Sequence, residues 1–152
     1  MDRLLLTLTP DMSIDETLQL FLQNDLSAAP VVDREKKLVG IVSSFDFLQK
    51  EAFEGSLLAV GGSQEMVEKY VEAAKKICGQ RVEDVMSKNP STAFVDTPMR
   101  TAAAIMAEKR LHRLPVVNSD GHLVGMLTTS HVIKDLMHVL QKLPSGKDLV
   151  ES

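Results

Sequence analysis

Short apolar runs alternate with polar turns and with stretches of helical periodicity along the first third of the chain. The apolar positions of 18–22 follow Ser13, and Glu16 completes a capping-box pattern that predicts a helix start at Ser13. The runs PVVD and LVGIV are separated by the polar residues 34–37 and are short and apolar enough for buried strands. A further helix is expected to start at or just past Ser43. The predicted order is helix, strand, turn, strand, helix.

The same order returns 85 positions later. The segment SAAPVVDREKKLVGIVSSFD aligns without a gap on HRLPVVNSDGHLVGMLTTSH. In this second copy, Thr97 is expected to cap the first helix and Pro98 to occupy its first turn. The last helix is predicted over 129–142, with apolar residues along one face. Because one such unit has a small amphipathic sheet that it cannot bury alone, the two copies are expected to pack together about a pseudo-twofold axis.

The segment between the copies contains a glycine-rich break, EGSLLAVGGS, followed by a predicted amphipathic helix, QEMVEKYVEAAKKICG. We therefore divide the chain into a first repeat at 1–51 with a short or truncated prelude, a linker with a helix at 52–80, a second repeat at 81–143 and a C-terminal tail at 144–152. The predicted fold class is α/β, of the α+β type: two pseudo-twofold-related repeats, each a small sheet flanked by helices.

Composition narrows the class of protein. Apolar residues make up 44% and charged residues 25% of the 152 residues, as in soluble globular proteins. The net charge of −4 and the lack of basic runs argue against nucleic-acid binding. No apolar stretch is long enough for a membrane span, so we expect a cytoplasmic protein without a membrane partner. Cys78 is the only cysteine, and we interpret it as a small buried group on a helix rather than a reactive thiol.

Four segments carry a resemblance to a known family: RVEDVMSKNPSTAFVDTP, HRLPVV, GIVSSFD and GMLTTSH. In this order they resemble a tandem pair of CBS domains, called a Bateman module, and most closely the stand-alone CBS pairs of bacteria and of plant organelles. The resemblance implies that both repeats form one module that senses an adenosine nucleotide (AMP, ADP or ATP, or alternatively S-adenosylmethionine). It also implies homodimers, head to head or head to tail, and neither catalysis nor a cofactor.

Asp46 is the main candidate for ligand binding in the first copy. An ionised carboxylate accepts hydrogen bonds from two neighbouring ribose hydroxyls, although an acid near a helix N-terminus is also stabilised by the helix dipole alone. Ser43 and Ser44 are candidates for binding a phosphate or ribose oxygen, or are plain helix caps. The resemblance implies a ligand groove between the repeats at Asp46, and it adds further residues to this groove. Pro90, Ser91, Thr92 and Ala93 come from the second prelude, the segment that precedes the first helix of the second repeat, and His112 and Arg113 lie on the phosphate side. The alternative for the last two is an ordinary surface pair.

The second groove departs from the family pattern, because His131 stands where aspartate is common. Its candidate residues are Leu5, Leu6, Thr7, Thr128, Thr129, Ser130 and His131. A neutral imidazole has one acceptor and cannot hold both ribose hydroxyls, so we expect this groove to be weaker for nucleotides. His131, Asp135 and His138 share a helix face at a spacing compatible with a metal, but a solvated face is the preferred interpretation and no metal is predicted.

The leading functional hypothesis is a regulatory module: nucleotide binding between the repeats changes their orientation, or that of a homodimer, and an unidentified effector protein responds. The alternative is a protein-interaction or dimerisation module with no functional nucleotide site. An enzyme is not predicted, because GGS at 61–63 lacks the lysine of a phosphate-binding loop and Cys78 has no histidine near it in the sequence.

Overall fold

The computed structural model describes residues 6–48 and 63–143. These residues belong to two compact units, one spanning Leu6–Pro90 and the other containing the chain from Ser91 onward. Each unit has its own three-stranded sheet and its own cluster of buried apolar side chains. Mixed α/β units with small sheets flanked by helices confirm the predicted fold class.

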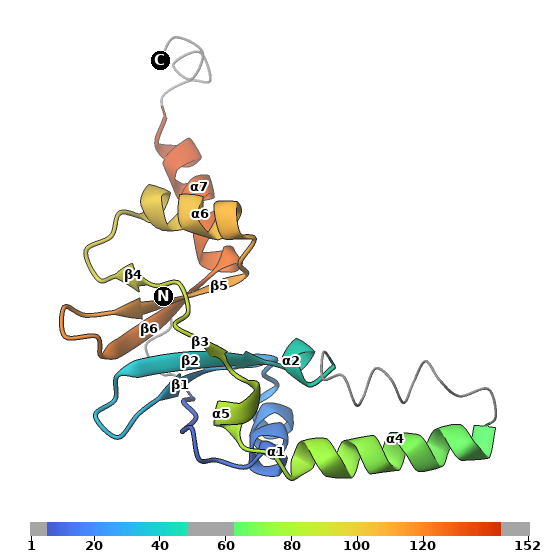
Figure 1. The fold of residues 1–152 in the computed structure, drawn as a ribbon. Helices are drawn as coiled ribbons and strands as arrows, with labels where there is room; N and C mark the ends of the chain where they lie inside the picture. Colours follow the sequence, from blue (N-terminus) through green and yellow to red (C-terminus); the bar gives the residue numbers. More distant parts are fainter. Residues whose placement is uncertain (1–5, 49–62, 144–152) are drawn as a thin grey trace. The chain divides into compact units, whose positions relative to one another are not determined.

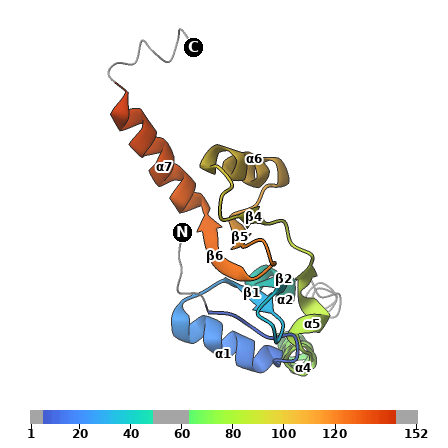
Figure 2. The ribbon, with the colours of Figure 1, turned by 90° about the vertical axis from the view of Figure 1, so that its left-hand side faces the viewer.

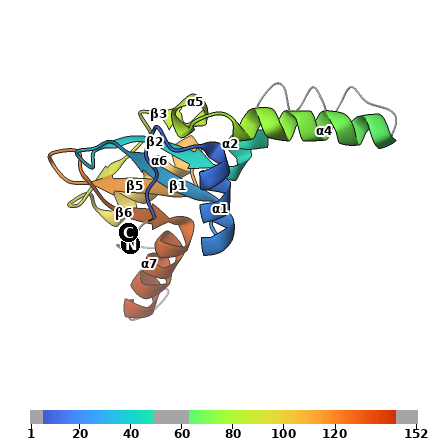
Figure 3. The ribbon, with the colours of Figure 1, turned by 90° about the horizontal axis from the view of Figure 1, so that it is seen from below.

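The first unit contains a sheet of order β1-β2-β3, in which neighbouring strands are antiparallel. Its elements are α1 (Ile14–Asn24), β1 (Ala28–Val32), β2 (Leu38–Ser43), α2 (Ser44–Leu48), α4 (Ser63–Cys78), α5 (Val82–Val85) and β3 (Ser87–Lys88). Figures 1 and 3 show α1 beside this sheet, whereas α4 runs away from it. Residues 87–88, which fall within the predicted second repeat at 81–143, thus supply a strand to the sheet of the first unit.

The N-terminus of α1 confirms the predicted capping residue. The Oγ atom of Ser13 accepts a hydrogen bond from the backbone N–H of Glu16 at 3.1 Å. Thr17 is buried in the apolar core one turn later, and its hydroxyl donates to the backbone carbonyl of Ser13 at 2.9 Å. The helix start is therefore fixed by two local bonds, and the buried hydroxyl does not remain unpaired.

The second unit contains a sheet of order β4-β5-β6, with β4 parallel to β5 and β6 antiparallel to it. Its elements are β4 (Ala93–Phe94), α6 (Met99–Lys109), β5 (Arg113–Val117), β6 (Leu123–Thr128) and α7 (Thr129–Lys142). Figure 2 shows α7 continuing from the end of β6 and extending past α6. The bounds of α7 confirm the predicted helix, which contains no fully buried residue; its half-buried Val132 packs against the core of the second unit.

The backbone confirms the tandem repeat at its offset of 85. Ala28 pairs with Ser43 in the first unit and Arg113 with Thr128 in the second. In both hairpins the strand register shifts just before the equivalent valine, which is the last residue of β1 and of β5. The helix before each hairpin ends on a left-handed residue, at Asp25 and at the position 85 later. Equivalent residues therefore occupy equivalent places in the two units.

The predicted cap of α6 is wrong. Pro98, with extended backbone angles, is the N-cap residue, and the helix begins at Met99. The hydroxyl of Thr97 instead accepts a hydrogen bond from the N–H of Phe94 at 2.8 Å, while the N–H of Thr97 donates to the carbonyl of Phe94. The threonine closes a turn before the helix, which takes its side chain away from the helix amides.

Replacement of Gly40 by alanine is expected to destabilise the first unit by about 1–3 kcal/mol. A Cβ atom at Gly40 would lie 2.5 Å from Sδ of Met86 and 3.0 Å from the backbone oxygen of Ser87, because β3 passes directly beside β2. Chemical denaturation measures the loss. Gly79→Ala is the matched control, since its Cβ would meet only backbone oxygens at 3.5 Å or more. Equal stability of both variants would contradict the close approach at Gly40.

Candidate nucleotide site

Asp46 lies in the first turn of α2, just after β2 ends. Its Oδ2 atom accepts a hydrogen bond from the N–H of Ser43 at 2.7 Å and lies 3.4 Å from the Ser43 hydroxyl. The residue is half-buried. Within residues 6–48 and 63–143, Oδ1 of Asp46 has no hydrogen-bond partner. One carboxylate oxygen therefore fixes the junction of strand and helix, and the other retains its capacity to accept hydrogen bonds.

His131 makes the corresponding contact in the second unit. The N–H of Thr128 donates to Nδ1 of His131 at 2.9 Å, and the Thr128 hydroxyl lies 2.8 Å from the same nitrogen. Since Nδ1 accepts from a backbone N–H, the imidazole is unprotonated at that nitrogen. The histidine thus keeps the capping role of Asp46 while losing the carboxylate. The sequence-based expectations for these two residues included ribose binding and, for Asp46, stabilisation by the helix dipole, but not this shared capping bond.

The residues of the second prelude fall at the division between the units. Pro90 ends the first unit, and Ser91, Thr92 and Ala93 begin the second. Ala93 is buried in β4, and the hydroxyl of Ser91 accepts a hydrogen bond from Nζ of Lys109 at 2.8 Å. Lys109 places a cation beside the predicted nucleotide-binding segment. It was missed because it lies on α6, where the sequence alone indicates only a solvated helix end.

His112 and Arg113 flank the helix start of their own unit. Arg113 is half-buried at the beginning of β5 and pairs with Thr128. His112 is exposed, and its carbonyl accepts from the N–H of Thr129 at 3.1 Å. Both residues therefore lie next to the Thr128 junction within the second unit, and their contribution to the Asp46 groove stays a prediction.

The remaining residues of the predicted second groove are described only in part. Leu6 is half-buried and Thr7 exposed, and both precede Leu8, which bridges β1 in the first unit. Ser130 is exposed in the first turn of α7. Leu5 lies outside the described residues. The joining of these residues into one groove stays a prediction.

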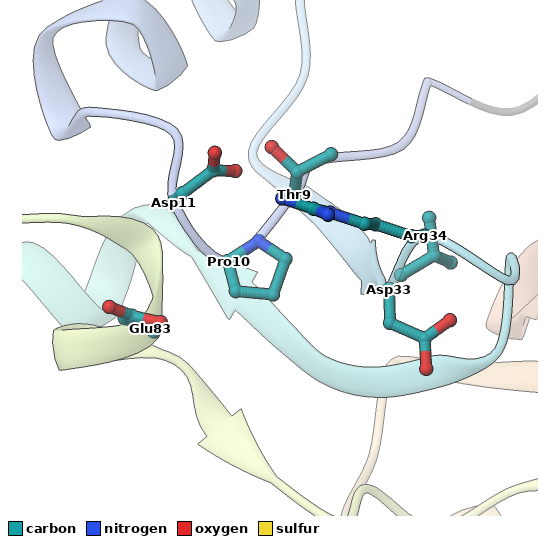
Figure 4. A pocket seen from close by; sticks show the side chains of 7 residues that line it. Thr9, Pro10, Asp11, Asp33, Arg34 and Glu83 are labelled. Atoms are coloured by element: carbon teal, nitrogen blue, oxygen red, sulfur yellow. The ribbon is translucent and has the colours of Figure 1, made fainter.

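A separate hollow, not anticipated from the sequence, lies at the opposite end of the first hairpin from Asp46 (Figure 4). This cavity of about 460 Å³ is lined by Thr9, Pro10, Asp11, Val32, Asp33, Arg34 and Glu83. The side chain of Arg34 extends over the hollow toward Thr9. In the sequence, Thr9-Pro10-Asp11 indicates only a loop. The hollow could not be predicted, because this loop meets the hairpin turn only in the folded chain.

The acidic groups of this hollow are held by local bonds. Oδ1 of Asp33 accepts from the N–H groups of Glu35 and Lys37, at 2.8 and 3.0 Å. A hydrogen bond from the Thr9 side chain, and then one from its own backbone amide, lower the pKa of the Asp11 carboxyl, with smaller contributions from nearby arginines. Asp33 thus forms the hairpin turn, and Asp11 is kept in its ionised form.

Other classes of site find little support in the residues that are described. Among them, no group of three or more histidine, cysteine or acidic side chains is arranged to hold a metal ion. Cys78 is a free, half-buried thiol at the end of α4. No described helix combines the length and apolar character needed to cross a membrane.

Comparison with known proteins identifies the family. A model of the CBS domain matches residues 1–52 and 82–138. The chain belongs to the CBS-domain family. The two matched segments confirm the resemblance to a tandem CBS pair.

The chain is similar to curated and solved CBS proteins. It is 34% identical over 137 residues to the chloroplastic CBS domain-containing protein CBSX1 of Arabidopsis thaliana, covering 86% of this chain and 58% of CBSX1. The chain thus spans little more than half the length of that relative. A crystal structure of CBSX2 in complex with AMP is 29% identical, with a TM-score of 0.67 and 89% of each chain covered. The structure of CBSX2 from Arabidopsis thaliana has a TM-score of 0.72 at 28% identity, covering 91% of this chain and 90% of that one.

Proposed function

We propose that this CBS pair is a regulatory module that binds an adenosine nucleotide, with AMP as the first ligand to test. One observation carries the proposal: Asp46 is half-buried, one of its carboxylate oxygens is fixed by Ser43, and the other is directed to no partner among the described residues. A carboxylate held in this way is preorganised to accept hydrogen bonds from a ribose. The similarity to CBSX2, which was crystallised with AMP, supports the choice of ligand.

In this proposal each part of the nucleotide meets a different part of the chain. Asp46 accepts from the ribose hydroxyls, and Ser43 and Ser44 contribute their hydroxyls at the start of α2. Backbone groups of Pro90–Ala93 contact the adenine. His112 and Arg113 pair with the phosphate, since a guanidinium forms bidentate, charge-assisted hydrogen bonds to phosphate oxygens. ADP, ATP and S-adenosylmethionine are further ligands of the same class.

Calorimetry of the intact chain with AMP, ADP, ATP, S-adenosylmethionine, adenosine and GTP tests the function. We expect binding of the adenine nucleotides, no binding of GTP, and at least about tenfold tighter binding of AMP than of adenosine because of the phosphate contacts. Thermal unfolding gives an independent readout, since ligand at 100 times its dissociation constant adds about 2.7 kcal/mol to stability. A chain that binds none of these ligands would contradict the proposal.

A second candidate function is a protein-interaction or dimerisation module without a nucleotide site. The observation that favours it is the apolar surface of α7, where Ile133, Leu136 and Met137 are each more than half exposed. In the regulatory proposal such a surface is also useful, because a ligand changes an assembly only through different affinities for its states. No reaction is assigned to the chain in either case.

A further inference from the structure

The hollow at the first hairpin turn (the hairpin hollow, Figure 4) shares part of its wall with a second hollow in the same unit. The second hollow, of about 350 Å³, has Thr9 and Asp11 in common with the first and is also lined by Gln80. The side-chain oxygen of Gln80 is buried and has no hydrogen-bond partner among the described residues. Most buried polar atoms in folded proteins are hydrogen-bonded, so an acceptor in this state beside a hollow indicates a donor from a ligand.

The loop that lines both hollows is held in place by backbone hydrogen bonds on two sides. On one side, the N–H of Leu8 donates to the carbonyl of Pro30 and its carbonyl accepts from the N–H of Val32, both at 2.9 Å. On the other side, the N–H of Glu83 donates to the carbonyl of Pro10 at 3.0 Å. The walls of the hairpin hollow are therefore fixed before any ligand binds, which lowers the cost of binding.

The second unit shows which charged residue of the hairpin turn the fold itself uses. Asn118 is the equivalent of Asp33 at the offset of 85, and its Oδ1 atom accepts from two N–H groups of its own turn at 3.0 Å each. Asp33 makes the same two bonds in the first unit. Arg34, by contrast, corresponds to Ser119. The turn thus accounts for Asp33 but not for the arginine that extends over the hollow.

Groups of opposite charge border the hairpin hollow. The hydrogen bond from the Thr9 side chain lowers the pKa of the Asp11 carboxyl and keeps it ionised. Arg34 extends over the hollow toward Thr9, and its guanidinium forms no ion pair with any described residue. Pro10 and the buried Val32 supply the apolar part of the lining. A carboxylate and a guanidinium therefore lie at one small hollow beside an apolar wall.

We propose that the hairpin hollow is a binding site for a free α-amino acid with an apolar side chain. The ligand's carboxylate binds Arg34, since a guanidinium forms bidentate, charge-assisted hydrogen bonds to carboxylates. Its ammonium group binds Asp11, which both hollows share, with the oxygen of Gln80 as a further acceptor. Its side chain packs on Pro10 and Val32. The volume of about 460 Å³ lies within the range of about 300–1,000 Å³ that is usual for small-molecule sites.

Charge argues against simpler ligands. An amine without a carboxylate would place a second cation beside Arg34 and leave the guanidinium unpaired. An acid without an amine would face the carboxylates of Asp11 and Glu83. The acids of the hollow also do not form a metal site among the described residues. An α-amino acid has both charged groups on one carbon atom, so it matches both sides of the hollow.

NMR titration of the intact, isotope-labelled chain tests the site. The probes are the free amino acids L-valine, L-leucine and L-methionine. Two analogues of leucine are titrated in parallel: 3-methylbutylamine lacks the carboxylate, and 4-methylpentanoate lacks the ammonium group. We expect the amino acids to shift the backbone amide signals of Thr9, Asp11, Arg34 and Glu83. Both analogues are expected to bind at least about tenfold more weakly than leucine, because each loses a charge-assisted contact.

Two substitutions assign the two ends of the ligand. In Arg34→Gln, leucine is expected to bind no more tightly than 3-methylbutylamine, because the partner of the carboxylate is gone. In Asp11→Asn, leucine is expected to bind no more tightly than 4-methylpentanoate, because the partner of the ammonium group is gone. Lys37→Gln and Asp15→Asn are the matched controls. They remove the same charges from the same turn and from the first turn of α1, at exposed positions that line neither hollow.

Three results would overturn the proposal. The first is the absence of shifts at these amides with all three amino acids. The second is equal binding of leucine and 3-methylbutylamine by the wild type, which would make the hollow a site for amines alone. The third is an equal loss of leucine affinity in the test variants and in their controls. AMP is left out of every sample, so these outcomes do not depend on the nucleotide proposal.

Discussion

Asp46→Ala is expected to lower the affinity for AMP by about 100-fold or more. A carboxylate that accepts two ribose hydroxyls makes two charge-assisted hydrogen bonds, each contributing about 1.5–3 kcal/mol. The variant also removes the bond from the Ser43 N–H to Oδ2, at 2.7 Å, which holds the strand–helix junction in place. Calorimetry with AMP measures the loss directly, provided that the variant is shown to be folded at the temperature used.

Two control variants separate the ribose contact from the cap. Asp46→Asn retains an oxygen that accepts from the Ser43 N–H but loses the negative charge, so we expect an intermediate loss of about tenfold. Asp135→Asn removes an acid from α7 and is expected to leave AMP affinity unchanged. If Asp46→Ala binds AMP as tightly as the wild type, Asp46 has only its capping role and the proposed ribose site is wrong.

The local pattern of the sequence predicted much of each unit. The offset of 85 is visible in the printed sequence, and it governs strand register down to the pairs Ala28–Ser43 and Arg113–Thr128. The cap at Ser13 was also predictable, because its partner is three residues away. Such features depend on neighbouring residues and on apolar periodicity, both of which a single sequence contains.

Contacts between distant residues were not predictable in the same way. Lys109 reaches Ser91 across 18 positions, and an apolar hollow between α6 and α7 depends on how two helices pack. The error at Thr97 has a local cause. Its hydroxyl could accept either from a helix amide or from the N–H of Phe94, and it accepts from Phe94. At His131 the residue type was noticed, but its bond to the Thr128 N–H requires a ring orientation that the sequence does not contain.

The two strand–helix junctions explain how the repeats diverged without losing their fold. Asp46 and His131 are equivalent in sequence, and each accepts from the N–H of the residue three positions earlier. An acceptor at this position is sufficient to hold the helix start, so stability does not require a carboxylate there. Ribose binding does require more than one acceptor. We therefore expect the difference between the repeats to affect ligand binding rather than folding.

His131→Asp is accordingly expected to create a second AMP site. The aspartate would keep the bond to the Thr128 N–H through one oxygen, as Asp46 does with Ser43, and would offer the other oxygen to a ribose. Arg113 pairs with Thr128 across the hairpin of the same unit. Calorimetry should show the number of AMP molecules per chain rising from one to two.

The double variant Asp46→Ala, His131→Asp tests whether the additional AMP binds at position 131. It should bind one AMP, at the new site, whereas Asp46→Ala alone binds weakly. His131→Asn, which keeps the capping acceptor without the charge, should remain at one AMP per chain. If His131→Asp still binds a single AMP and the double variant binds none, the loss of the acid is not what distinguishes the two grooves. The cause would then lie in the residues around them, because the cap at position 131 is preserved in both variants.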